Sequence, residues 1–169
     1  MWPVNLWVAC AERCRKACLS LRRAMPLHLI KLCVGVDSIR ELDEWIKERM
    51  AQKKKKKEPL EHIHTTRMMP TQKEALLDGG SLYWVIKGMV SARQKLIDLR
   101  QFTDKEGVKR CRIVMEPKLL PVVPKPRGAF QGWRYLKANE APADLAKGGK
   151  GLTALPEEMR RELHELGLL

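Results

Sequence analysis

Two histidines lie two positions apart in the segment Glu61-His62-Ile63-His64, an arrangement that suits metal binding. Alternate side chains of a β-strand project to the same face, so in a strand His62 and His64 would point together. Two neutral imidazoles on one face can share a zinc ion, which needs a third ligand such as Glu61 or His28. The pattern therefore gives a metal-site hypothesis with His62 and His64 as ligands. Histidines that are only buried or solvated produce the same spacing, and no other motif calls for a cofactor.

The same region supports a second chemical hypothesis, phosphoester hydrolysis. The segments Leu27–Lys31 and His64–Arg67 resemble the paired motifs of two-histidine phosphoesterases, in which two histidines and two hydroxyl groups grip a phosphodiester. This partial resemblance implies a phosphoester hydrolase in which His28, His64 and Thr66 are the catalytic candidates. A metal-dependent enzyme that uses His28, His62 and His64 is the related alternative. The sequence leaves open whether the protein is an enzyme at all.

Basic residues point to a different class of function, the binding of RNA or another polyanion. Lys and Arg total 33 against 20 Asp and Glu, which gives a formal charge of +13 at pH 7. Such an excess attracts nucleic acid, although a solvated basic surface that aids solubility gives the same composition. The candidate nucleic-acid-binding residues cluster in the second half of the chain: Arg93, Lys95, Arg100, Lys109, Arg110, Arg112, Arg127, Trp133, Arg134 and Tyr135.

The first six of these candidates are expected on two paired strands, where they would form a cationic ribbon for phosphate contacts. The last four combine aromatic rings with arginines, a combination that can stack exposed bases. Trp133 and Tyr135 also fit a role in the core, which is the more common place for aromatic side chains of strands.

Periodicity and turn residues predict the elements that must position these side chains. Strands are predicted at residues 27–36, 61–68, 81–90, 94–102, 108–115 and 131–136. A helix is predicted from Ile39, capped by Ser38, until the lysine block Lys53–Lys57, which is predicted to be a solvated turn. A short helix capped by Thr71 is predicted to end at Leu77. Residues 104–107 predict a hairpin turn, and the four prolines of residues 117–126 predict an extended loop or edge passage.

These elements predict a single α+β domain at residues 25–146, with a small mixed or mainly antiparallel sheet and two early helices. A partly open barrel, similar to the RNA-binding modules associated with pseudouridine synthases, is one form of this fold. Residues 1–24 are predicted to be an extension outside the domain, from upstream translation or for targeting. Residues 147–169 are predicted to be a flexible linker and an amphipathic C-terminal helix, with Leu155, Met159, Leu163 and Leu166 at helical spacing.

Cysteine usage and hydropathy favour a cytoplasmic location. The five cysteines are odd in number and lack CxxC spacing, which fits reduced thiols better than a disulfide framework. No apolar run approaches the length of a transmembrane helix, so no membrane span is expected.

Five blocks of sequence together resemble one family: MPLHLIKLCVGVDSI, HTTRMMP, LLDGGSLYWVIKGMV, ARQKLIDLRQF and FQGWRYL. The family is an uncharacterised bacterial domain-of-unknown-function family, and the resemblance covers about residues 25–144. It implies a bacterial, cytoplasmic protein and places residues 1–24 outside the domain, but it implies no activity. The leading hypothesis from the sequence is an RNA-binding module, with the hydrolase as the alternative. A non-catalytic interaction module that docks a partner through its C-terminal helix is the third possibility.

Overall fold

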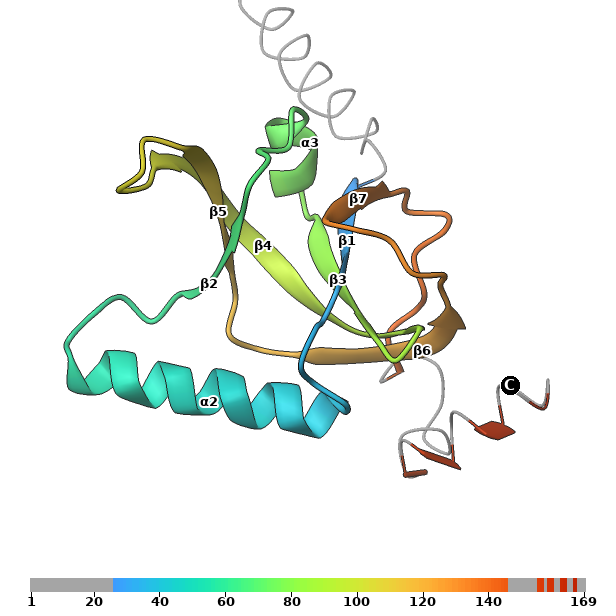
Figure 1. Ribbon diagram of the computed structural model, residues 1–169. Helices are drawn as coiled ribbons and strands as arrows, with labels where there is room; N and C mark the ends of the chain where they lie inside the picture. Colours follow the sequence, from blue (N-terminus) through green and yellow to red (C-terminus); the bar gives the residue numbers. More distant parts are fainter. Residues whose placement is uncertain (1–25, 146–154, 157, 160–161, 164–165, 167–169) are drawn as a thin grey trace, which may run out of the picture.

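The computed structural model describes residues 26–145 and, near the C-terminus, residues 155, 156, 158, 159, 162, 163 and 166. Seven strands of the described residues form one mixed sheet in the order β2-β5-β4-β3-β1-β7, with β6 paired to β4 beside this path (Figure 1). The strands are β1 (His28–Leu32), β2 (His62–Thr66), β3 (Ser81–Ile86), β4 (Met89–Thr103), β5 (Lys109–Met115), β6 (Leu120–Pro126) and β7 (Trp133–Leu136). The helices are α2 (Ile39–Lys55) and α3 (Lys73–Leu77).

The sheet is open, which corrects the predicted fold. β2 and β7 stand at the two ends of the strand order, and no pairing joins them within the described residues. The predicted barrel is therefore wrong. The predicted arrangement of two early helices and a C-terminal helix around a small sheet is also wrong, because the sheet dominates and α2 and α3 are the helices bounded in the described part. The C-terminal helix expected after residue 155 lies largely outside the described residues, as does the expected extension at residues 1–24.

A single long strand, β4, explains why the sheet is larger than predicted. Its first half pairs with β3 on one side and with β6 on the other, and its second half pairs with β5. β1 and β3 are parallel, whereas every other strand pair is antiparallel. The end of the strand predicted at residues 81–90 and the whole strand predicted at residues 94–102 thus belong to one strand, β4 (Figure 1). The hairpin predicted between β4 and β5 is confirmed, and β6 with its prolines is an edge passage as predicted.

The strand predicted at residues 81–90 is two strands joined by a tight turn, so that prediction is wrong. Lys87 and Gly88 both have positive φ angles, 47° and 78°. Two successive residues of this kind form the type I′ loop that suits the twist of a two-residue hairpin. The sequence pattern missed the turn because a lysine rarely adopts a left-handed conformation.

Helix α2 begins as predicted but ends later. The Ser38 hydroxyl accepts a hydrogen bond from Glu41 N at 3.1 Å, and the Glu41 carboxylate accepts one from Asp37 N at 2.8 Å. The predicted end at the lysine block is wrong, because the helix continues to Lys55. Cations in the last turn interact favourably with the negative end of the helix dipole, and Lys53 Nζ also donates to the Glu61 carbonyl at 2.7 Å. No helix of the described residues is long and apolar enough to cross a membrane.

Alternation along the strands divides the core between the two faces of the sheet. The first, here called the helix-covered face, carries a cluster to which α2 and α3 contribute: Leu29, Leu42, Ile46, Leu76, Leu82, Trp84, Ile86, Leu96, Leu99, Cys111, Ile113 and Met115. The second, here called the loop-covered face, carries a smaller cluster against which Phe130 and Ala141 pack: Ile30, Tyr83, Val85, Val90, Val122 and Leu136. A side chain on one face cannot reach a side chain on the other.

Gly80 lies where no side chain fits. A Cβ atom there would stand 2.1 Å from the carbonyl oxygen of Leu76 and 2.4 Å from that of Leu27, and both are backbone atoms. We expect Gly80→Ala to lower the free energy of unfolding by about 2–3 kcal/mol, measured as a lower urea midpoint. Gly128→Ala is the matched control, because a Cβ at that position meets nothing within 4 Å. Equal midpoints for the two variants would contradict the close approach of the chain at Gly80.

Candidate functional site

His62 and His64 share the helix-covered face, as the spacing predicted. The His62 ring stands edge-on to Trp45 of α2 at 5.9 Å between ring centroids, and the His64 ring stands edge-on to Trp84 at 5.5 Å. His28 lies on the loop-covered face, where its ring meets Tyr83 at 5.3 Å and its Nδ1 accepts a hydrogen bond from Ser81 N. The sheet therefore separates His28 from the other two histidines.

This separation leaves the predicted catalytic and metal-binding groups apart. Among the described residues, no three His, Cys, Asp or Glu side chains come together as a metal site. Thr66, the predicted hydroxyl partner of His64, is buried and donates to the Met68 carbonyl at 3.0 Å. The two-histidine arrangement expected of a phosphoesterase is thus not assembled by the fold.

His62 belongs instead to a buried polar network centred on Gln94, and His64 packs against Trp84 of that network. The Gln94 Oε1 atom accepts hydrogen bonds from Trp84 Nε1 at 2.9 Å and from His62 Nδ1 at 3.2 Å, and its Nε2 donates to the Glu116 carbonyl at 2.9 Å. A carboxamide oxygen can only accept, so His62 must carry its proton on Nδ1. Burial lowers the pKa of both His62 and His64 to about 4, which keeps the rings uncharged at neutral pH.

Arg93 and Arg100, two members of the predicted cationic ribbon, are held by acidic side chains. Arg93 makes a two-point ion pair with Asp144, at 2.5 and 2.7 Å, and also donates to Ser81 Oγ. Arg100 makes a two-point contact with Glu61, at 2.8 and 2.9 Å, and a third bond to Asp98. These guanidinium groups are therefore already engaged.

Three further ribbon residues also have local partners. Arg110 pairs with Asp104 of the hairpin turn, and Lys95 lies 3.7 Å from the carboxylate of Glu116. Arg112 stacks over the Phe102 ring at 4.2 Å. Lys109 and Arg112 are the exposed members of the set for which the described residues supply no ion pair. Most of the charge of the predicted ribbon is therefore paired within the fold.

The aromatic residues of β7 are turned away from its arginine. Trp133 Nε1 donates to the Met68 carbonyl at 3.1 Å, and the Tyr135 hydroxyl accepts from the backbone N–H groups of Thr71 and Gln72. Trp133 and Tyr135 therefore anchor the loop before α3. This contact also replaces the predicted Thr71 cap, which is wrong, because α3 has no side-chain cap. Arg134 lies between these residues and projects to the opposite side of the strand.

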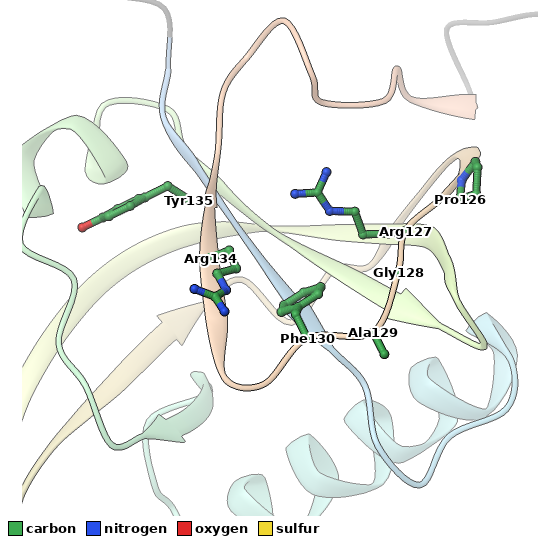
Figure 2. Close-up of a pocket in the computed structure, with 7 residues that line it drawn as sticks. All are labelled: Pro126, Arg127, Gly128, Ala129, Phe130, Arg134 and Tyr135. Atoms are coloured by element: carbon green, nitrogen blue, oxygen red, sulfur yellow. The ribbon is translucent and has the colours of Figure 1, made fainter.

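Arg127 and Arg134 line an open pocket of about 710 Å³ beside β7. Figure 2 shows the Arg127 side chain extending from the loop after β6 toward β7, with the Phe130 ring below it, whereas Tyr135 points away toward α3. Both arginines are exposed, and neither has an acidic partner within the described residues. The complete lining is Pro126, Arg127, Gly128, Ala129, Phe130, Arg134 and Tyr135. Two guanidinium groups without acidic partners at one pocket have the chemistry to bind an anion, because each presents a planar fork of donors that matches phosphate.

The chain matches the family model described as "Protein of unknown function (DUF1489)" over residues 29–169. The chain belongs to the DUF1489 family. No curated protein and no solved structure matches it. The predicted membership of a domain-of-unknown-function family is therefore confirmed, and the match continues to residue 169, past the expected end near residue 144.

Sequence reasoning missed two residues that matter in this DUF1489 protein. Gln94 was passed over as an ordinary strand residue, although a glutamine at a core position of an alternating strand signals a buried hydrogen-bond network. Phe130 is absent from the predicted candidate residues, although the segment from Phe130 to Tyr135 sets its aromatic residues beside Arg127 and Arg134, a pattern typical of base stacking.

Removing the Gln94 carboxamide tests the buried network. We expect Gln94→Leu to lower the free energy of unfolding by about 3 kcal/mol, because the Trp84 indole N–H and the His62 ring N–H lose their acceptor. Urea unfolding measures the effect. Gln101→Leu, an exposed position on the same strand, is the control and should change stability by less than about 0.5 kcal/mol. A Gln94→Leu protein as stable as this control would rule out a structural role for the network.

Buried neutral histidines give the DUF1489 fold a pH dependence of definite sign. The folded pKa of His64 is about 4, below the ordinary value of 6.5, so the unfolded chain takes up protons first as the pH falls. This contribution to stability is complete above pH 6.5 and is lost as the pH falls toward 4. His64→Phe keeps an aromatic contact with Trp84 but removes the titrating group. We expect this variant to lose less stability than the wild type as the pH falls from 6.5 to 4. Unfolding midpoints measured as a function of pH provide the comparison, and identical pH profiles would refute the assignment.

Proposed function

We propose that this DUF1489 protein binds RNA, and that the pocket lined by Arg127 and Arg134 makes its phosphate contacts. The observation that supports this proposal is that two exposed, unpaired arginines from separate segments line one open pocket. Arginine binds phosphate through paired N–H donors, and these bonds are stronger than those between neutral groups. The formal charge of +13 on the chain would add long-range attraction for a polyanion.

The scaffold around the pocket favours a fixed spacing between the two arginines. Arg127 follows directly on β6, and its backbone N–H donates to the Gly88 carbonyl of the β3–β4 turn at 2.8 Å. Arg134 lies within β7, which pairs with β1 through the register Ile30↔Arg134. Because both segments are attached to the same sheet, the backbone positions of the two arginines are fixed before a ligand binds, and only their side chains have to be ordered.

The competing functions have less support. A phosphoester hydrolase or metal-dependent enzyme needs His28 beside His62 or His64, whereas these lie on opposite faces of the sheet. Four of the six ribbon residues are in ion pairs that must open before they can contact phosphate: Arg93, Lys95, Arg100 and Arg110. An interaction module that uses the C-terminal helix rests on residues that lie largely outside those described.

Neutralising the two pocket arginines tests the function. We expect the double variant Arg127→Gln and Arg134→Gln to bind a fluorescein-labelled single-stranded RNA about tenfold more weakly at low salt, measured by fluorescence anisotropy. The slope of log affinity against log salt should fall by about 1.4, since each phosphate contact on a single strand contributes about 0.7.

The matched control removes the same charge elsewhere. Arg40 and Arg67 are exposed and lie outside the pocket, so the double variant Arg40→Gln and Arg67→Gln should keep the affinity close to that of the wild type. Equal losses in the two double variants would mean that net charge, and not the pocket, governs binding. An absence of RNA binding by the wild-type protein at low salt would overturn the function itself.

A further inference from the structure

We propose that the Arg127–Arg134 pocket accepts an unpaired nucleotide, with the base stacked on Phe130 and the adjoining phosphate held by the arginines. The ligand of the pocket is then single-stranded RNA and not an RNA duplex. This inference rests on the proposed function and deepens it, because it names the part of RNA that the site recognises.

Phe130 is held in place before any ligand arrives. The side chain packs against the loop-covered cluster of Ile30, Tyr83, Val85, Val90, Val122 and Leu136, yet it is only partly buried and lines the pocket. An aromatic ring fixed by the core on one side offers a stacking surface without a further ordering cost. Stacking on such a ring is tolerant of base identity, because every base has a π-face.

Small residues form the edge of the pocket between Arg127 and Phe130, where a base would enter. Gly128 and Ala129 lie between Arg127 and Phe130, and a Cβ atom added at Gly128 would meet nothing within 4 Å. The volume of about 710 Å³ falls within the range of about 300–1,000 Å³ that is usual for small-molecule sites, so a nucleotide fits it. Figure 2 shows Phe130 and both arginines on the same stretch of loop and strand.

Stacking on Phe130 discriminates between single strands and duplexes. The bases of a duplex are paired and stacked on one another. The Phe130 ring can therefore stack on a nucleobase of a duplex only after that nucleobase has been unpaired. The bases of a single strand splay outward with less hindrance. Phosphate contacts alone do not make this distinction, because both forms of RNA present phosphates.

Three probes at matched phosphate concentration separate the contributions of base and charge: single-stranded oligouridine, an RNA duplex, and inorganic polyphosphate, which carries charge without bases. We expect the wild-type protein to bind oligouridine more tightly than either of the others. Phe130→Leu keeps an apolar contact with the loop-covered cluster but removes the ring, and it should weaken oligouridine binding about tenfold with an unchanged salt slope. Phe130→Tyr, which retains the ring, should bind like the wild type.

Phe102→Leu is the matched aromatic control. Phe102 belongs to β4, its ring lies under the Arg112 guanidinium group of β5, and it is outside the pocket. Its affinity for oligouridine should equal that of the wild type. Oligouridine binding unchanged by Phe130→Leu would overturn the stacking role, as would equal wild-type affinity for oligouridine, duplex and polyphosphate. In either case, a loss of binding in the variant with both pocket arginines changed would still uphold the proposed function. Failure of the wild-type protein to bind any of the three probes would overturn both.

Discussion

The buried carboxamide of Gln94 is the interaction on which the arrangement of the sheet depends. Its side chain has no solvent exposure and joins three other segments, through Trp84 of β3, His62 of β2 and the carbonyl of Glu116 after β5. A slip of β4 by one residue would turn the carboxamide to the other face and leave these groups buried without partners. The network therefore specifies the register of β4 against its neighbours more strictly than the surrounding apolar side chains do.

Once Gln94 faces the helices, alternation places Arg93 on the loop-covered face. There Arg93 pairs with Asp144, next to the point where the Val123 N–H donates to the Ala143 carbonyl. The segment after β7 is thereby held against β6. The two strands beside the pocket, β6 and β7, are themselves paired with β4 and β1 of the sheet. The orientation of β4 that Gln94 specifies is therefore also the one that lets Arg93 bind the segment after β7.

Local features of the fold, and Arg127 and Arg134 as candidates, could be predicted from the sequence, whereas the sequence could not show which candidate residues the fold leaves without partners. The Ser38 cap and the hairpin at Asp104 depend on neighbours within a few residues, and both are confirmed. The face occupied by His28 depends on its strand's parallel pairing with β3, a contact across more than fifty residues that no local pattern encodes. The partners of the cationic ribbon are equally remote, because Glu61 reaches Arg100 only after β2 has joined β5.

The location of charge, and not its amount, decides which basic residues are available to a polyanion. Arg93 is largely buried with Asp144, and a phosphate that displaced this carboxylate would leave a buried negative charge without its partner. Arg134 lies on the same face of the sheet, with β3 and β1 between its strand and β4, but it is exposed and has no acidic partner among the described residues. The first arginine thus contributes to stability and the second to a surface that can bind, although nothing in their local sequence distinguishes them. A strongly basic composition therefore locates a site only when the cations already neutralised within the fold have been set aside.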